Sequence, residues 1–412
     1  MNKYLILLFL LGLQASVHGK PFRTEAYVNH IRSIQVHPIG NRQAPPVIVD
    51  GENRQIEIKF DEMSHEYKNL YYTLIHCNAD WNPSILTPIE YIYGFREMQI
   101  EDYLVSFNTT MSYTHYRIMF PNENTRFKVS GNYAVQVFDS DRPDKPLLSA
   151  CFSICEANVM PVSVKISTAT DIDFNKAHQQ VGFTLNAGNY RITSPQQELK
   201  IFVLQNNRTD NMVKNLRPAT IAGTQYIYDH NRELIFEAGN EYRRFEMTTT
   251  AYKGMGIERL DFHEPYFHVS LFEDTPRAGK SYIYDEDQNG RYLVRAVNAE
   301  NQDSEADYFF VQFALSAPEP FPGRVFIQSE AFNNILDARS EMQYNREKKI
   351  YEKTALLKQG AYNYMYLLTE GLSAKGTTAP IEGNCFETKN EYRILVYYRA
   401  VGERFDRLVG IY

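Results

Sequence analysis

Short runs of alternating apolar and polar residues recur along almost the whole chain. In RQIEIKF, Ile56, Ile58 and Phe60 alternate with polar and charged residues, and GNYAVQVFD repeats the pattern between residues 131 and 139. Alternation that is bounded by Gly, Pro, Asn or Asp is typical of half-buried β-strands. Because the runs recur at the short spacing of sandwich domains, we expect an all-β fold made of tandem immunoglobulin-like β-sandwiches.

Interruptions of this pattern divide the chain. Met160-Pro161 separates CFSIC from the next strand-like run, and a further block opens at ADYFFVQFAL and continues into the proline-rich APEPFPG. We therefore expect three sandwiches, with the boundaries 20–157, 158–302 and 303–412. Three local features are also predicted: a hairpin turn at His230-Asn231, two strands around residues 358–360, and a short helix from Asn334 to Glu341.

The first residues show the features of a secretory signal peptide in the usual order. Lys3 supplies a positive charge, residues 4–13 form an apolar run of ten, and Ala15, Val17 and Gly19 offer small or compact residues for cleavage. An apolar run of this length is too short to cross a bilayer, which needs about 20 residues. We expect residues 1–19 to be removed and the mature chain to be a soluble protein of an exported compartment.

Composition argues against a nucleic-acid partner and is compatible with a protein partner. The formal net charge is −7 and becomes −8 when Lys3 is removed, and this mild acidity argues against nucleic acid, which requires clustered cations. The chain has 30 Tyr and 25 Phe but one Trp. Such rings favour strands, so most are expected to fill the sandwich cores, although Tyr-rich surfaces are also common where proteins meet.

The four cysteines leave two alternatives open. Cys151 and Cys155 lie about 13 Å apart if CFSIC is extended, which is too far for a disulfide bond. Cys77 with Cys151 or Cys155 is one alternative in an exported chain, and free buried thiols are the other. No C-x-x-C pattern that would indicate a redox or zinc site is present.

The chain lacks the common catalytic and metal-binding motifs. H-E-x-x-H, G-x-S-x-G, the P-loop and the dinucleotide-binding glycine pattern are all missing. DEDQNG resembles the start of a calcium loop, but the twelfth position, which should be Glu, is Ala296. Asn289-Gly290 therefore predicts a tight turn, and the spacing of His263 and His268 does not predict a metal site. We expect no catalytic residue, no metal, no cofactor and no enzymatic activity.

Several unusual runs together resemble the plug protein family associated with the type IX secretion system of Bacteroidetes. They are HCNADWNPSILTPIEYIYGF, YLVSFNTTMSYTHYRIMFPNE and SGNYAVQVF near the start, and LLKQGAYNYMY, IEGNCFETKNEYRILVYYR and RFDRLVG near the end. The resemblance implies a periplasmic protein, associated with the outer membrane, that closes the periplasmic opening of a large outer-membrane translocon barrel. It implies no small-molecule substrate and no direct membrane insertion.

Residues that resemble interface hot spots gather in two parts of the chain. Trp, Tyr and Arg often carry most of the energy of a protein interface. Trp81 is either a lid that packs over the end of the sandwich or part of a contact edge, and Tyr397 and Tyr398 point to opposite faces of one strand, so at most one is exposed. The candidate contact residues are Trp81, Tyr91, Phe95, Arg96, Arg399 and Arg404.

Two other non-enzymatic functions fit the sequence. The third block is also similar to early-set sandwich domains that accompany glycogen- and starch-active proteins, and Tyr344, Tyr351 and Tyr364 would then replace the usual Trp as sugar platforms. A periplasmic scaffold for outer-membrane proteins is the second alternative. The fold class expected in every case is all-β, with immunoglobulin-like or early-set sandwiches in tandem.

Overall fold

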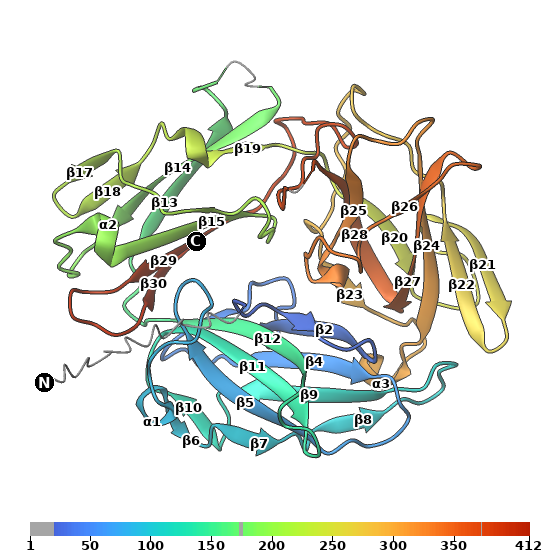
Figure 1. Ribbon diagram of the computed structural model, residues 1–412, viewed down its shortest axis with the longest axis horizontal. Coiled ribbons are helices and arrows are strands. Elements are labelled where there is room, and N and C mark those ends of the chain that lie inside the picture. Colours follow the sequence, from blue (N-terminus) through green and yellow to red (C-terminus); the bar gives the residue numbers. More distant parts are fainter. Residues whose placement is uncertain (1–19, 173–175, 372) are drawn as a thin grey trace, which may run out of the picture.

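Three β-sandwiches make up the protein (Figure 1). The computed structural model describes residues 20–172, 176–371 and 373–412. The expected signal peptide, residues 1–19, lies outside the described residues. Within the described ranges, no helix has the length and apolar character needed to cross a membrane. The expected all-β fold of tandem sandwiches is confirmed.

The first sandwich has a core built from residues 31–154. Its aromatic side chains fill that core, and the rings of Tyr133 and Phe152 stack with centroids 5.8 Å apart. One sheet contains β12 (Pro146–Cys155), β11 (Gly131–Asp139), β5 (Leu70–Cys77) and β7 (Glu97–Gln99), with β1 (Glu25–Ala26) and β3 (Val47–Val49) beside β12. The other contains β2 (Ile31–Pro38), β4 (Ile56–Glu62), β9 (Thr114–Phe120) and β8 (Tyr103–Val105). A helix and a separate two-stranded ribbon complete it: α1 (Pro88–Tyr91), β6 (Ile92–Gly94) and β10 (Thr125–Phe127).

The second sandwich is made from two distant parts of the chain. Its core combines residues 160–236 with residues 392–409. One sheet contains β13 (Val162–Thr168), β14 (His178–Asn186), β18 (Gln225–Tyr228), β17 (Thr220–Ala222) and β19 (Ile235–Glu237). The opposite layer contains β16 (Val213–Lys214), β15 (Leu199–Gln205), β29 (Tyr392–Tyr398) and β30 (Arg407–Ile411), and the short helices are α2 (Pro195–Glu198) and η1 (Arg232–Leu234).

The third sandwich is inserted between these two parts, with a core from residues 245–381. One group of strands contains β20 (Arg243–Met247), β28 (Gly360–Thr369), β23 (Tyr292–Val294) and β25 (Arg324–Gln328). The other sheet contains β21 (Ile257–His263), β22 (Tyr266–Leu271), β24 (Tyr308–Ser316), β27 (Ile350–Lys358) and β26 (Gln343–Asn345), and the short helices are α3 (Gln302–Glu305) and η2 (Glu330–Phe332). The chain crosses from the second sandwich to the third and later returns, as Figure 1 shows.

The strand pairing differs from the expected boundaries 158–302 and 303–412. β22 pairs with β24 across position 302, and β15 pairs with β29, which lies almost 190 residues later in the sequence. The first core ends at Ile154, and the second begins at Met160. The alternation of a strand identifies the face that is buried but not the strand that pairs with it, so the insertion left no local signal in the sequence.

Local expectations had mixed outcomes. β27 and β28 meet at Gln359 as two successive strands, which confirms the prediction around residues 358–360. The hairpin at His230-Asn231 is wrong, because β18 and β19 both pair with β14 and not with each other. The helix expected from Asn334 to Glu341 is also wrong: these residues form turns, and Asn334 adopts a left-handed φ of 54°.

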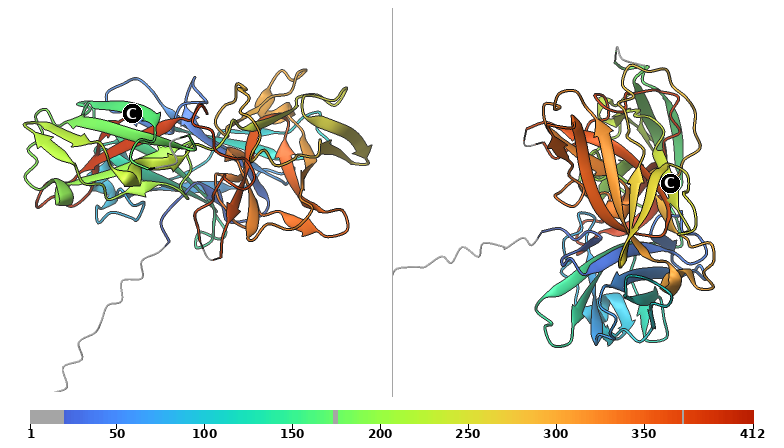
Figure 2. Two further views of the ribbon diagram at one scale, coloured as in Figure 1. Left: turned by 90° about the horizontal axis from the view of Figure 1, so that it is seen from above. Right: turned by 90° about the vertical axis from the view of Figure 1, so that its right-hand side faces the viewer.

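The first sandwich contacts both of the others (Figures 1 and 2). A single ten-stranded sheet continues from the first sandwich into the second, where β12 and β30 run parallel through the pair Cys155 and Leu408. The third sandwich meets the first through α3 and β27, where charged side chains carry most of the polar contacts.

Candidate functional site

The segment 77–95 leaves the end of β5 and crosses the end of the first sandwich. Trp81 packs against a small cluster that contains Cys77, Ala134 and Cys151, on the side of the sheet opposite the main core. Its carbonyl accepts a hydrogen bond from the N–H of Phe22 (3.1 Å). This half-buried position supports the lid alternative for Trp81.

Tyr91 departs from the expectation that it contacts a partner. The side chain is only 4% exposed, because the single turn of α1 directs it inward. Its hydroxyl donates a hydrogen bond to the carbonyl of Leu74 (2.9 Å). Phe95 and Arg96, four and five residues later, are both exposed. Phe95 and Arg96 are therefore accessible to a partner, whereas Tyr91 is not.

The two arginines near the C-terminus have different environments. Arg399 donates to Asp406 (2.8 Å) and to the side-chain oxygen of Asn78 (2.7 Å), and Asp406 is fully buried. Arg399 thus joins the second sandwich to the first and is not a free contact residue. Arg404 is half-exposed and donates to Glu90 (2.6 Å), which places it beside α1. Tyr397 and Tyr398 are both buried.

His76 supports the segment from below, and the sequence analysis did not single it out. Its ring is 1% exposed and lies within 5.8 Å of the rings of Tyr91, Tyr133 and Phe405, measured between centroids. One ring nitrogen is 2.8 Å from Ser84 Oγ and the other 3.2 Å from the Ser130 carbonyl. Burial lowers the pKa of His76 to about 4, so the imidazole is neutral near pH 7.

We expect stability to fall as the pH falls from about 6.5 to about 4. In this window the unfolded chain protonates His76 while the folded protein, with the pKa of His76 at about 4, does not, so the unfolded state binds more protons. The contribution approaches about 1.4 kcal/mol per pH unit. Urea unfolding at several pH values should show a shallower slope for His76→Gln than for the unsubstituted protein. Identical slopes would contradict the assignment.

A group of buried charges joins the first and third sandwiches. Asp61, on β4, accepts hydrogen bonds from Lys358 Nζ (2.6 Å), Tyr308 Oη (2.6 Å) and His115 Nδ1 (2.6 Å). The side chains of Asp61 and Lys358 are each 1% exposed. Burial by itself would raise the pKa of Asp61, but Lys358 and His115 lower it, so the carboxylate is charged. We call these four residues the Asp61 cluster; Lys59 and Asp303 add a neighbouring ion pair at 2.8 Å.

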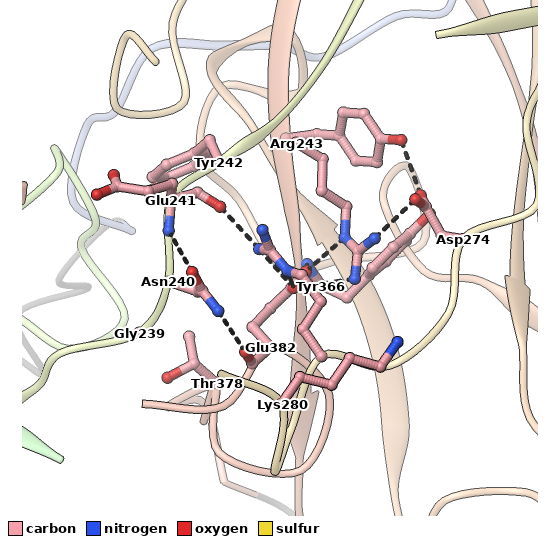
Figure 3. Close-up of polar contacts among 12 residues, drawn as sticks. Gly239, Asn240, Glu241, Tyr242, Arg243, Asp274, Lys280, Tyr366, Thr378 and Glu382 are labelled. Atoms are coloured by element: carbon pink, nitrogen blue, oxygen red, sulfur yellow. Dashed lines mark hydrogen bonds and ion pairs between the residues drawn. The ribbon is translucent and has the colours of Figure 1, made fainter. Parts of the chain in front are cut away.

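A second group of charges has the residue types of an active site. The carboxylate of Glu382 is fully buried and accepts from Arg243 (3.1 Å) and Arg277 (2.7 Å). Figure 3 shows Arg243 between Glu382 and Asp274. Burial would raise the pKa of Glu382, but the two guanidinium groups lower it.

We call Glu382, Arg243, Arg277 and Asp274 the Glu382 cluster. Their other contacts give the cluster a structural role. Asp274 accepts from the hydroxyls of Tyr364 and Tyr366, at 2.8 Å each, and the N–H of Tyr366 donates to Glu382 (2.9 Å). Asn240 donates to the Glu382 carbonyl (3.0 Å), so the chain entering the third sandwich is bonded to the chain leaving it (Figure 3). These contacts occupy the carboxylates and hold the two crossings together.

The other candidate sites have ordinary structural explanations. The four cysteines are free thiols, and burial raises the pKa of Cys77 to about 12. Asn289 and Gly290 both have left-handed φ values, 51° and 83°, which confirms the predicted tight turn. His263 and His268 lie with ring centroids 5.1 Å apart, but no group of three or more metal-ligating side chains occurs in the described ranges.

The three tyrosines of the glycan alternative are not a sugar platform. Tyr351 and Tyr364 are 4% and 5% exposed and belong to the third core. Tyr344 packs against Tyr351 with centroids 4.9 Å apart, and its hydroxyl donates to the Ala317 carbonyl (2.9 Å). Core packing therefore accounts for all three rings.

Comparison with known proteins found a similar crystal structure and a matching family domain. A crystal structure of a hypothetical protein from Parabacteroides merdae superposes with a TM-score of 0.93 at 47% identity, covering 96% of this chain and 99% of that one. An alkylpurine DNA glycosylase from Pseudomonas fluorescens bound to DNA has a TM-score of only 0.17 at 12% identity, over 30% of this chain and 29% of that one, so the two folds are not alike. No curated protein matches. Residues 31–156 match the family described as the type 9 secretion system plug protein 1st domain, and the chain belongs to the type 9 secretion system plug protein family.

Proposed function

We propose that this protein is a non-enzymatic plug of the periplasm, which closes the periplasmic opening of a large outer-membrane translocon barrel of the type IX secretion system. Family membership supports a role in that system. The plug is an exported protein that associates with the outer membrane through the barrel, without a cofactor or a small-molecule substrate and without inserting into the bilayer.

The observation that carries the proposal is the way the three sandwiches are joined. The Asp61 cluster connects the first and third sandwiches. The continuous sheet connects the first and second, together with the hydrogen bonds from Arg399 to Asn78 and from the Ala79 N–H to Asp406. Buried charge pairs have strict geometric requirements, since each charge must keep its partners. A block joined in this way resists deformation, which is what closing an opening requires.

Permeability of the outer membrane tests this function. Deleting the gene is expected to increase sensitivity to large antibiotics in cells that have the translocon barrel, because the opening is then no longer closed. In cells that lack the barrel, the same deletion should change nothing. Equal sensitisation in both backgrounds would contradict the proposal.

Purification of the tagged protein from its own envelope separates the plug from a general scaffold. Recovery of one giant barrel subunit supports the plug. Recovery of many unrelated barrels supports the scaffold instead, and strong retention on α-glucans in affinity electrophoresis would support a glycan-binding function.

A further inference from the structure

Four large apolar side chains project into solvent from one short stretch of the first sandwich. Their exposed fractions are 66% for Ile85, 76% for Ile89, 63% for Tyr93 and 65% for Phe95; we call them the 85–95 patch. At roughly 200 Å² for a large side chain, they expose on the order of 500 Å². Apolar patches of about this size on a monomer are often functional.

Polar contacts hold the first half of this patch in place. Glu90 accepts from the N–H (2.7 Å) and hydroxyl (2.8 Å) of Thr87 on one oxygen and from Arg404 on the other (2.6 Å). Lys128 Nζ donates to the Ile89 carbonyl (2.7 Å) and lies 4.2 Å from the centre of the Tyr93 ring. The exposed side chains thus stand on a backbone that is fixed from both sides.

The ribbon of β6 and β10 fixes the second half. The N–H of Phe95 donates to the Asn124 carbonyl (3.0 Å), and the Thr125 hydroxyl donates to the Phe95 carbonyl (3.0 Å). Gly94 has φ of 95°, and a Cβ there would lie 1.9 Å from the Asn124 oxygen, so only glycine fits. Because the segment is already ordered, binding loses little conformational entropy.

The charges beside the patch indicate the chemistry of its partner. Arg96 and Arg126 are exposed, as are Glu97 and Glu123, and within the described part of the chain none of the four takes part in an ion pair or side-chain hydrogen bond. Arg126 stands opposite Tyr93 in the ribbon. Glu90, by contrast, is neutralised by Arg404. A complementary surface would be apolar at its centre and would offer carboxylates to the two arginines.

We propose that the 85–95 patch is the surface through which this protein meets the periplasmic rim of the translocon barrel, and that the rim offers an apolar socket bordered by carboxylates. This inference rests on the proposed function. A standard interface buries about 800 Å² on each side, so the patch supplies its central part.

Paired substitutions test the patch against matched positions elsewhere. The test variant is Ile89→Asp with Tyr93→Asp. The control is Ile283→Asp with Tyr252→Asp, in the third sandwich, where the side chains are exposed to nearly the same extent, 79% and 62%. Each tagged variant replaces the chromosomal copy, and the translocon barrel that co-purifies from the envelope is quantified. Thermal melting of each purified variant confirms folding.

The test variant is expected to recover at least about tenfold less barrel than the unsubstituted protein, as for loss of interface hot spots, while the control variant recovers the same amount. Barrel recovery that is unchanged in the test variant overturns the inference and leaves the proposed function standing. If the unsubstituted protein recovers no barrel, the proposed function fails, and the inference fails with it.

Three further measurements check the chemistry and the identity of the partner. Arg96→Gln with Arg126→Gln should weaken recovery and make it less sensitive to salt, because fewer charge pairs are then screened; unchanged salt sensitivity contradicts the carboxylate border. Light scattering of the purified protein should show a monomer, and vesicles of envelope lipid without the barrel should not retain it. If the protein forms a dimer, or binds vesicles, and Ile89→Asp with Tyr93→Asp abolishes this, the patch belongs to a second copy or to lipid. Either result would overturn the proposal.

Discussion

Asp61→Ala is expected to lower the free energy of unfolding by about 3–5 kcal/mol, the usual cost of removing one partner from a buried ion pair. Lys358 would be left as a charge that is 1% exposed, with the Asp303 carbonyl (2.8 Å) as its remaining hydrogen-bond acceptor. Tyr308 and His115 would lose an acceptor as well. Urea unfolding at neutral pH measures the change.

Two comparisons separate this effect from a general loss of stability. Asp61→Leu combined with Lys358→Met removes both charges and should be much less destabilising than either single change, because no charge is then left unpaired. Arg259→Ala removes an exposed ion pair with Asp261 and should cost at most about 1 kcal/mol. If the loss of unfolding free energy in the double variant equals the sum of the losses in the two single variants, Asp61 and Lys358 do not stabilise each other, and the prediction is wrong.

Glu382→Ala is expected to have an effect of similar size, about 3–5 kcal/mol. The change leaves Arg243 and Arg277 close together without the carboxylate that both contact, and it leaves the N–H of Tyr366 without its acceptor. Since Glu382 also lies beside the two crossings between sandwiches, limited proteolysis should become faster at residues 381–391. Thermal melting and the cleavage rate are the two measurements.

An exposed ion pair in the same sandwich serves as a control for the Glu382 prediction. Asp285 pairs with Arg244 at 2.5 Å, but their side chains are 52% and 31% exposed, so Asp285→Ala should cost at most about 1 kcal/mol. Glu382→Gln keeps the shape and one acceptor and should be intermediate. If Glu382→Ala and Asp285→Ala have the same melting temperature, the role assigned to the Glu382 cluster is wrong.

Local patterns in the sequence located strands well and contact residues only in part. The alternation in residues 56–60 and 131–137 marks β4 and β11, and the aromatic rings there fill the first core as expected. In the segment 77–95, Phe95 and Arg96 are accessible, but Tyr91 points inward and Trp81 packs on the sheet. Ile85, Ile89 and Tyr93 are more accessible than Tyr91 or Trp81, yet in elements as short as α1 and β6 the sequence pattern gives no sign of which way a side chain faces.

The sequence by itself determined the all-β class, because strand periodicity and turn residues act over a few neighbouring positions, and its unusual runs indicated the family by their resemblance to it. Tertiary structure alone decided that the third sandwich is inserted into the second, and that the polar face of β4 is buried. Glu57, Lys59 and Asp61 alternate with apolar residues like the outer face of an ordinary strand, but all three are buried. Glu57 pairs with Lys59 on the same strand (3.2 Å). Lys59 and Asp61 are buried because α3 and β27, about 250–300 residues later, supply the opposite charges, and no local pattern encodes a partner at that distance.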